Sequence, residues 1–152
     1  MASNQYELGS DEHLRIYISG THPQDWNALV GFLRTTESSV TLFVNGKEAS
    51  MLKNLSAILF NQANQCLLVI KLGDVCVRCQ SFRTHEINLD VDPANIGRKA
   101  NARILLRLMS ALGRALNKEV LLVRANGKVK PLFRYRPGEG ISELDNDECA
   151  GS

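Results

Sequence analysis

The sequence CLLVIKLGDVCVRCQSF, residues 66–82, contains two apolar runs that flank Gly73-Asp74. A glycine–aspartate pair between two apolar runs is a signal for a β-hairpin with a two-residue turn. Such a turn makes one face of the hairpin apolar and the other mixed, which is typical of a sheet covered on one side. The expected cross-strand pairs are Leu72 with Val75, Ile70 with Val77 and Leu68 with Cys79 on the apolar face, and Lys71 with Cys76 and Val69 with Arg78 on the other.

A strand and a long helix are predicted directly after this hairpin. Residues 84–91, THEINLDV, alternate polar and apolar side chains and therefore favour a strand. Asp92-Pro93 combines an N-cap residue with proline at the first helical position, so a helix is expected to begin there and to end at about Asn117. The apolar face of this helix is expected to contain Leu105, Leu108, Met109, Leu112, Ala115 and Leu116.

A second hairpin is predicted near the C-terminus, where VLLVRA and KVKPLFRY flank Asn126-Gly127. Asn-Gly is the strongest sequence signal for a type I′ turn. Pro131 cannot donate a hydrogen bond to a neighbouring strand, so residues 128–136 are predicted to form an edge strand or to carry a bulge. An exposed edge over Lys128–Arg136 would also allow a homodimer, although charged residues often protect such edges.

The N-terminal third contains two segments with a similar pattern. Laid without gaps on residues 40–59, residues 14–33 align LRIYISG with VTLFVNG. Each copy is predicted as a strand, a glycine and an amphipathic helix, with Gly20 and Gly46 providing the turn between strand and helix. The sequence thus raises the hypothesis of an internal duplication of a β-Gly-α unit.

These segments together predict one α+β (mixed α/β) domain over residues 13–137. The element order is βαβαβββαββ, with a sheet of six or seven strands, mostly antiparallel or mixed, covered by three helices. Residues 1–12 are predicted to be a flexible N-terminal tail. Residues 138–152 are predicted to be a flexible, acidic C-terminal tail.

Composition excludes several classes of protein. The apolar share of 44% and the charged share of 22% are those of a globular domain. The polar N-terminus does not resemble a signal peptide, and no apolar run approaches the length of a membrane span. Four irregularly spaced cysteines do not form a disulfide framework. We therefore expect a cytoplasmic protein that does not bind membranes.

Charge is concentrated in one part of the chain. Between residues 98 and 136 there are eleven lysines and arginines and a single acid, Glu119, so this segment carries +10 while the remainder carries −8. The predicted helix and last hairpin would then present a basic surface, which is suited to an acidic protein partner or to phosphates. The same surface could also be no more than a solvated helix face. The candidate binding surface comprises Lys99, Arg103, Arg107, Arg114, Arg124, Lys128, Lys130, Arg134 and Arg136.

Two other groups of residues contain side chains that can bind a metal ion. Cys76 and Cys79 form a C-x-x-C motif, but positions three apart on a strand point to opposite faces, so Cys79 is expected in the core and Cys76 partly exposed. Glu86, Asp90 and Asp92 could gather carboxylates near one strand. A polar strand face for Glu86 and Asp90 and a helix cap for Asp92 are sufficient to explain these acids, so we expect no metal and no cofactor.

The sequence favours binding over catalysis, because no nucleophile-elbow, zinc-protease or kinase motif is present. We expect a non-catalytic interaction or accessory protein, of the inhibitor or regulator type, that binds an acidic protein partner through its basic surface. Nucleic-acid binding through the same surface is the first alternative, since Phe133 and Tyr135 alternate with Arg134 and Arg136. A small metal-assisted enzyme is the second.

Overall fold

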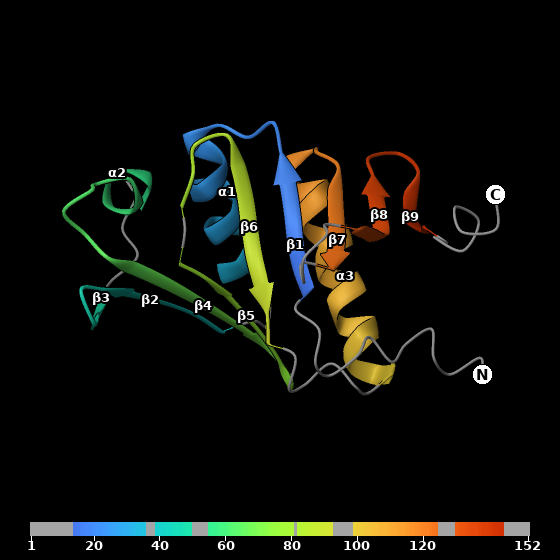
Figure 1. Ribbon diagram of the computed structural model, residues 1–152, viewed down its shortest axis with the longest axis horizontal. Coiled ribbons are helices and arrows are strands. Elements are labelled where there is room, and N and C mark those ends of the chain that lie inside the picture. The colour runs from blue at the N-terminus through green and yellow to red at the C-terminus, as the bar shows by residue number, and fades with distance from the viewer. Residues whose placement is uncertain are drawn as a thin grey trace.

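Nine strands form one antiparallel sheet in the described part of the chain (Figure 1). The structure is a computed structural model that describes residues 14–35, 39–49, 55–80, 82–92, 99–124 and 130–144, with side chains for all of these except 55, 56, 99, 100 and 130. Across the sheet the strand order is β3-β2-β4-β5-β6-β1-β7-β8-β9. The strands are β1 (Leu14–Ser19), β2 (Ser39–Val44), β3 (Lys47–Ala49), β4 (Cys66–Leu72), β5 (Val75–Cys79), β6 (Glu86–Val91), β7 (Val120–Arg124), β8 (Lys130–Arg136) and β9 (Gly140–Glu143).

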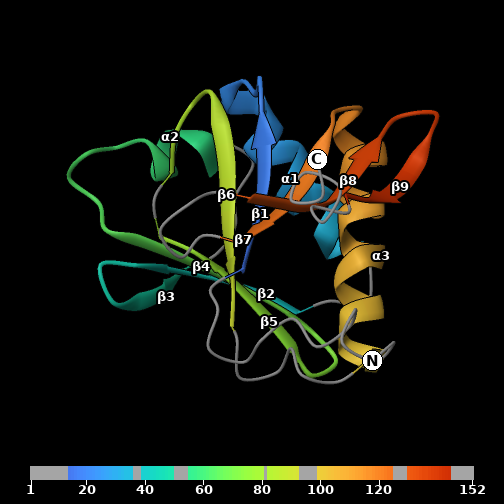
Figure 2. The same cartoon turned by 45° about the vertical axis from the view of Figure 1, so that its right-hand side comes forward.

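Three helices accompany the sheet in the described residues, namely α1 (Pro23–Arg34), α2 (Leu55–Leu59) and α3 (Lys99–Leu116). Figure 1 shows α1 next to β6, and α3 behind β7. In Figure 2, α3 lies beside β8 and β9, which it contacts, and α1 contacts both other helices. The predicted α+β class and its three helices are confirmed, and every strand pair is antiparallel. We call the sheet face opposite α1 and α3 the open face.

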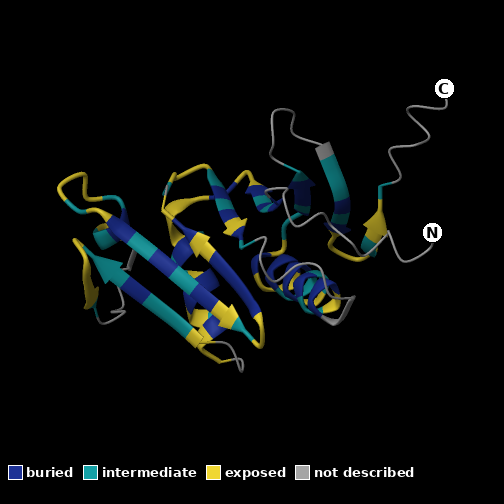
Figure 3. Cartoon of the chain, turned by 60° about the horizontal axis from the view of Figure 1, so that its bottom comes forward, coloured by how far each residue is buried: buried dark blue, intermediate teal, exposed yellow. Residues whose placement is uncertain are grey.

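The core lies between the sheet and the helices. On β1, Leu14, Ile16 and Ile18 point toward the helices and are almost completely buried. Alternation of this kind follows from the two-residue period of a strand, and Figure 3 shows it as alternating burial colours along the strands. The predicted core positions of β6 and α3 are also buried, except Ala115, which is exposed. The apolar face that ideal helix geometry predicts for α3 therefore includes one residue, Ala115, that is exposed to solvent.

The predicted hairpin forms from β4 and β5. Each of the five expected cross-strand pairs between β4 and β5 is present in that register. Gly73 has a φ of +56°, which the two-residue turn requires and which glycine adopts without strain. The turn residues and the side-chain alternation thus favour the same pairing of β4 with β5. A pairing register is well specified when these two signals agree.

Two strands lie outside the predicted set, so the expected total of six or seven strands is wrong. Asn45 and Gly46 have φ angles of +54° and +84° and connect β2 to β3 as a tight hairpin. Gly46 therefore does not lead from a strand into a helix, as Gly20 does before α1. The second predicted β-Gly-α unit is a β-hairpin in the structure, because Asn-Gly is itself a hairpin signal.

The other additional strand is β9, within the segment predicted to be a tail. Gly138 and Gly140 have positive φ angles and reverse the chain after β8, so that Ile141 pairs with Tyr135. Strand pairing therefore extends into the predicted tail, and residues 145–152 lie outside the described part of the chain. An edge strand needs few apolar residues, which is why composition alone indicated a tail.

β8 carries a bulge, as Pro131 predicted. The pairing register with β7 shifts between Leu122 and Val123, which face Phe133 and Pro131 respectively. β8 is not an edge strand, however, because β9 pairs with its other side. The argument for a homodimer through an exposed edge at residues 128–136 is therefore lost. The predicted Asn126-Gly127 turn lies outside the described residues.

The sheet bends strongly between β5 and β6. These strands pair only at Val77 with Val91 and at Arg78 with Asp90. Figure 1 shows the two strands diverging, with β2 to β5 running across the direction of β6. The divergence leaves space at one end of the sheet, close to α2 and to residues 82–84, for the pocket described below.

Candidate functional site

The arginines of α3 form an exposed row on the side of the helix away from the sheet. Arg103, Arg107 and Arg114 are exposed, as predicted, whereas the apolar residues between them are buried or half-buried. At about 100° per residue these three arginines fall within roughly 40° of one another around the helix, and they extend along about 16 Å of its axis. None of the three has an ion-pair or hydrogen-bond partner within the described part of the chain. We call Arg103, Arg107 and Arg114 the arginine stripe.

Arg134 and Arg136 lie on the open face, opposite the arginine stripe. On β8 they alternate with Phe133 and Tyr135, which are buried on the helix side of the sheet. Their guanidinium groups share one carboxylate, since Glu119 Oε2 is 3.7 Å from Arg134 Nε and 3.1 Å from Arg136 Nε. The basic residues that sequence order suggested as one surface are thus divided between two faces of the sheet.

The structure describes only some of the remaining residues of the predicted surface. Arg124 ends β7 opposite Leu14, and directly opposed residues share a face, so Arg124 lies on the helix side. Lys99 begins α3 and Lys130 begins β8, but their side chains lie outside the described residues. Lys128 lies outside the described part of the chain altogether. The arginine stripe is therefore the part of the predicted surface that the structure brings together.

The aromatic residues of β8 are not available for stacking on bases. Tyr135 and Phe133 are 4% and 8% exposed. The Tyr135 ring lies against Gly113 of α3, where a β-carbon added to the glycine would overlap the ring. Stacking on single-stranded nucleic acid requires exposed aromatic faces. The alternation of aromatic residues with arginines on β8 therefore reflects strand geometry, with the aromatic rings in the core.

The two cysteines of the C-x-x-C motif lie on opposite faces of the sheet. Cys76 pairs with Lys71 on the open face, and Cys79 pairs with Leu68 on the helix side. Cys79 is in the core as predicted, but Cys76 is also buried, at 9% exposed, where partial exposure was expected. Within the described residues, no three His, Cys, Asp or Glu side chains are grouped so that they could hold a metal ion.

The carboxylates of β6 bind side chains of the neighbouring strand β1. Glu86 accepts hydrogen bonds from the Tyr17 hydroxyl at 3.2 Å and from Asn88 Nδ2 at 2.7 Å. Asp90 Oδ1 is 2.9 Å from Arg15 Nε. Burial, followed by the adjacent Glu86 carboxylate, raises the pKa of the Tyr17 phenol. Sequence reasoning missed these partners because Tyr17 and Glu86 are 69 residues apart in the chain, and Arg15 and Asp90 are 75 apart.

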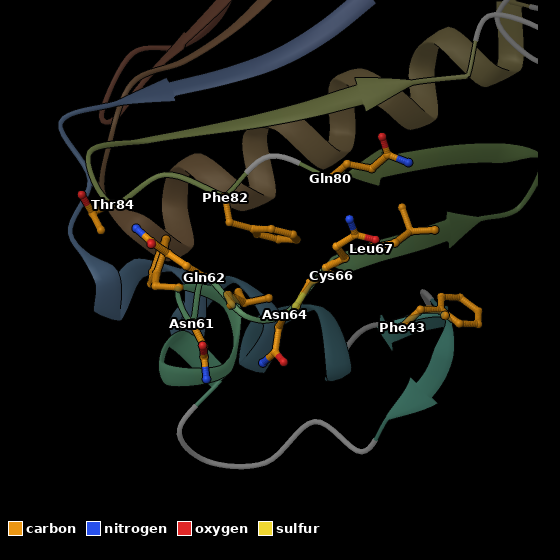
Figure 4. A pocket seen from close by; sticks show the side chains of 13 residues that line it. Phe43, Asn61, Gln62, Asn64, Cys66, Leu67, Gln80, Phe82 and Thr84 are labelled. Carbon is orange, nitrogen blue, oxygen red and sulfur yellow. The ribbon is translucent and has the colours of Figure 1, made fainter.

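An open pocket of about 940 Å³ lies at the α2 end of the bent sheet. Side-chain amides and phenyl rings dominate its lining, so we call it the amide pocket. Figure 4 shows the Phe82 ring projecting into the middle of the pocket, with Gln80 on one side and Cys66 on the other. Burial raises the pKa of the Cys66 thiol. The amides are Asn61, Gln62, Asn64, Gln65 and Gln80, and the rings are Phe43, Phe60 and Phe82.

Sequence reasoning missed the amide pocket entirely. The residues N-Q-A-N-Q at 61–65 form a short polar run between an apolar helix and a strand, which resembles an ordinary connection. Gln80 and Phe82 lie beyond β5, and only the divergence of β5 from β6 brings them to the same region as α2. No sequence motif carries that information.

The fold and these sites describe an α+β protein with an arginine-bearing outer helix and a separate neutral pocket. A comparison of the chain with known protein families, curated proteins and solved structures found no match. In the part of the chain that the structure describes, no helix combines the length and the apolar character needed to cross a membrane.

Proposed function

We propose that this protein is a non-catalytic interaction protein, of the inhibitor or regulator type, that binds an acidic segment of a protein partner through the arginine stripe. The observation that carries this proposal is the contrast between two sets of arginines. Arg134 and Arg136 form ion pairs with Glu119, and Arg136 also with Glu139, whereas Arg103, Arg107 and Arg114 have no acidic neighbour among the described residues. Among the placed residues of the predicted basic surface, the stripe is thus the set whose charge is left for a partner.

Helix energetics support the same proposal. Arg103 and Arg107 are one turn apart, and like charges at that spacing destabilise a helix by about 0.2–0.5 kcal/mol. The sequence of α3 contains no acidic residue that could offset this repulsion. A carboxylate-rich partner would relieve it, and guanidinium groups bind carboxylates in a bidentate geometry that lysine cannot provide.

A protein partner is favoured over nucleic acid by the aromatic residues. Phe133 and Tyr135, which could have stacked on bases, are buried under α3. The arginines of β8 lie on the other face of the sheet and cannot join the arginine stripe in one phosphate-binding surface. A row of three arginines provides few of the phosphate contacts on which nucleic-acid affinity depends.

Charge reversal of the arginine stripe tests this proposal. We expect the triple variant Arg103→Glu, Arg107→Glu and Arg114→Glu to bind a fluorescent glutamate-rich peptide at least about tenfold more weakly than the unaltered protein. Each exposed ion pair contributes up to about 1 kcal/mol, and 1.4 kcal/mol corresponds to a tenfold change. Fluorescence anisotropy at increasing salt measures the affinity, which should fall as salt screens the charges.

The matched control reverses three cations elsewhere on the molecule. Lys47, Lys71 and Arg78 are exposed on other strands, and changing all three to Glu alters the net charge equally. We expect this control to retain peptide binding. Equal losses in both triple variants, or no peptide binding at low salt, would contradict the proposal. Tighter binding of oligonucleotides that depends on the stripe would favour the nucleic-acid alternative.

A further inference from the structure

We propose that the amide pocket is a binding site for an uncharged purine base, presented as a free base or a nucleoside. The site is separate from the arginine stripe, since it lies at the α2 end of the sheet and none of its lining residues belongs to α3. Three properties of the pocket carry this inference: its neutral lining, a fixed aromatic ring that projects into it, and three glutamine side chains that have no hydrogen-bond partner among the described residues.

The lining excludes a ligand with strong charge. None of the thirteen lining residues carries a charge at neutral pH. A phosphate or carboxylate bound there would lose water without gaining a counter-ion, which is costly. The volume of about 940 Å³ lies within the range of small-molecule sites, roughly 300–1,000 Å³. A neutral molecule of nucleoside size therefore matches the pocket.

A pair of contacts holds the central ring in place. Phe82 packs against Trp26 with ring centroids 4.9 Å apart and an angle of 60° between the rings. Trp26 is fully buried, and its Nε1 donates a hydrogen bond to the carbonyl oxygen of Arg83 at 2.9 Å. Phe82 is thus fixed on one side and remains half-buried on the pocket side. A fixed phenyl ring is a stacking surface for a planar heterocycle, worth about 1–3 kcal/mol per base.

The side-chain amides around this ring differ in whether they already form hydrogen bonds within the protein. Asn61 Oδ1 accepts a hydrogen bond from the backbone of Ala63, and Asn64 Nδ2 donates to the carbonyl oxygen of Ile58. In the described part of the chain, the side chains of Gln62, Gln65 and Gln80 have no hydrogen-bond partner. An amide offers a donor and an acceptor together, which matches the N6 and N7 edge of adenine.

An extended peptide is a less suitable occupant. Peptides that bind by strand addition require an unpaired sheet edge. The strands that line the pocket through Phe43 and Leu67 are paired on both sides, β2 with β3 and β4, and β4 with β2 and β5. A peptide could therefore bind only through side chains, whereas a flat heterocycle uses both the ring and the amides.

Calorimetric titration with adenosine tests the proposal. We expect saturable binding that the double variant Gln62→Ala and Gln80→Ala weakens at least about tenfold, since a bidentate amide–adenine pair contributes about 1–3 kcal/mol. Phe82→Leu should weaken it by a similar factor through loss of stacking. Trp26 is the only tryptophan in the chain and contacts Phe82, so its fluorescence provides a second signal.

Matched controls separate specific from general effects. Gln24→Ala removes an exposed glutamine from α1, outside the pocket, and should leave adenosine affinity unchanged. AMP should bind no more tightly than adenosine, because no cation lines the pocket. The inference is wrong if adenosine and guanosine do not bind at millimolar concentration, or if the double variant binds as well as the unaltered protein. Preferential binding of AMP, or of a neutral peptide, would also overturn it.

Discussion

Replacing Trp26 by alanine is expected to lower the free energy of unfolding by about 3–5 kcal/mol, the usual effect of removing a large buried aromatic side chain. Trp26 is fully buried and contacts two rings edge-on, with centroids 4.9 Å from Phe82 and 6.5 Å from Phe60. Its substitution also leaves the Arg83 carbonyl oxygen without the indole donor. Urea unfolding must be followed by circular dichroism, since the variant contains no tryptophan.

Trp26→Phe is the matched control for this prediction. Phenylalanine keeps most of the apolar volume but cannot donate to Arg83, so the loss should be smaller, about 1–3 kcal/mol. Because Trp26 fixes Phe82, the alanine variant should also lose adenosine binding under conditions in which it remains folded. A loss of less than about 1 kcal/mol for Trp26→Ala would show that this corner of the core does not support α1 and the amide pocket.

Gly113→Ala is expected to destabilise the protein by about 2 kcal/mol, although alanine is the better helix former. Alanine in place of glycine normally gains about 1 kcal/mol in a helix. At Gly113, however, the new β-carbon would overlap Cδ2 and Cε2 of the Tyr135 ring, closer than real atoms approach. Tyr135 is buried and belongs to β8, so relieving the overlap requires a shift between α3 and the sheet, and overpacking costs about 1–3 kcal/mol or more.

Replacing Gly31 by alanine is expected to change the stability in the opposite direction from Gly113→Ala. Gly31 lies in α1, and a β-carbon there would meet no atom within 4 Å. This variant should therefore be stabilised by up to about 1 kcal/mol. Thermal or urea unfolding of both variants measures the contrast. Stabilisation of Gly113→Ala comparable to that of Gly31→Ala would show that Tyr135 does not pack against α3 as described.

Substituting Tyr135 tests the cause of the Gly113 effect. Tyr135→Ala destabilises by itself because it empties a buried position. In the double variant the added β-carbon has no ring to meet, so the combined loss should be clearly smaller than the sum of the two single losses. Additive losses would locate the origin of the Gly113 effect elsewhere.

The arginine stripe illustrates how far a linear pattern predicts a surface. Arg103, Arg107 and Arg114 were predicted together because their spacing follows the helical period, and they are together. Arg134 and Arg136 were joined to them by closeness in the chain alone. The alternation of β8 sends these two side chains to the other face, where they meet Glu119. Periodicity predicts neighbours within one element but not between two elements.

The β4–β5 hairpin and the bend beside it show most clearly what the sequence determined locally and what only the tertiary structure decided. Turn residues and alternation specify the hairpin, its register and the faces of α3, because these depend on atoms only a few residues apart. The nine-strand order, the pairing of Glu86 and Asp90 with β1, and the amide pocket depend on contacts between distant segments. Such contacts follow from how all the apolar faces are buried at once, which no local pattern encodes.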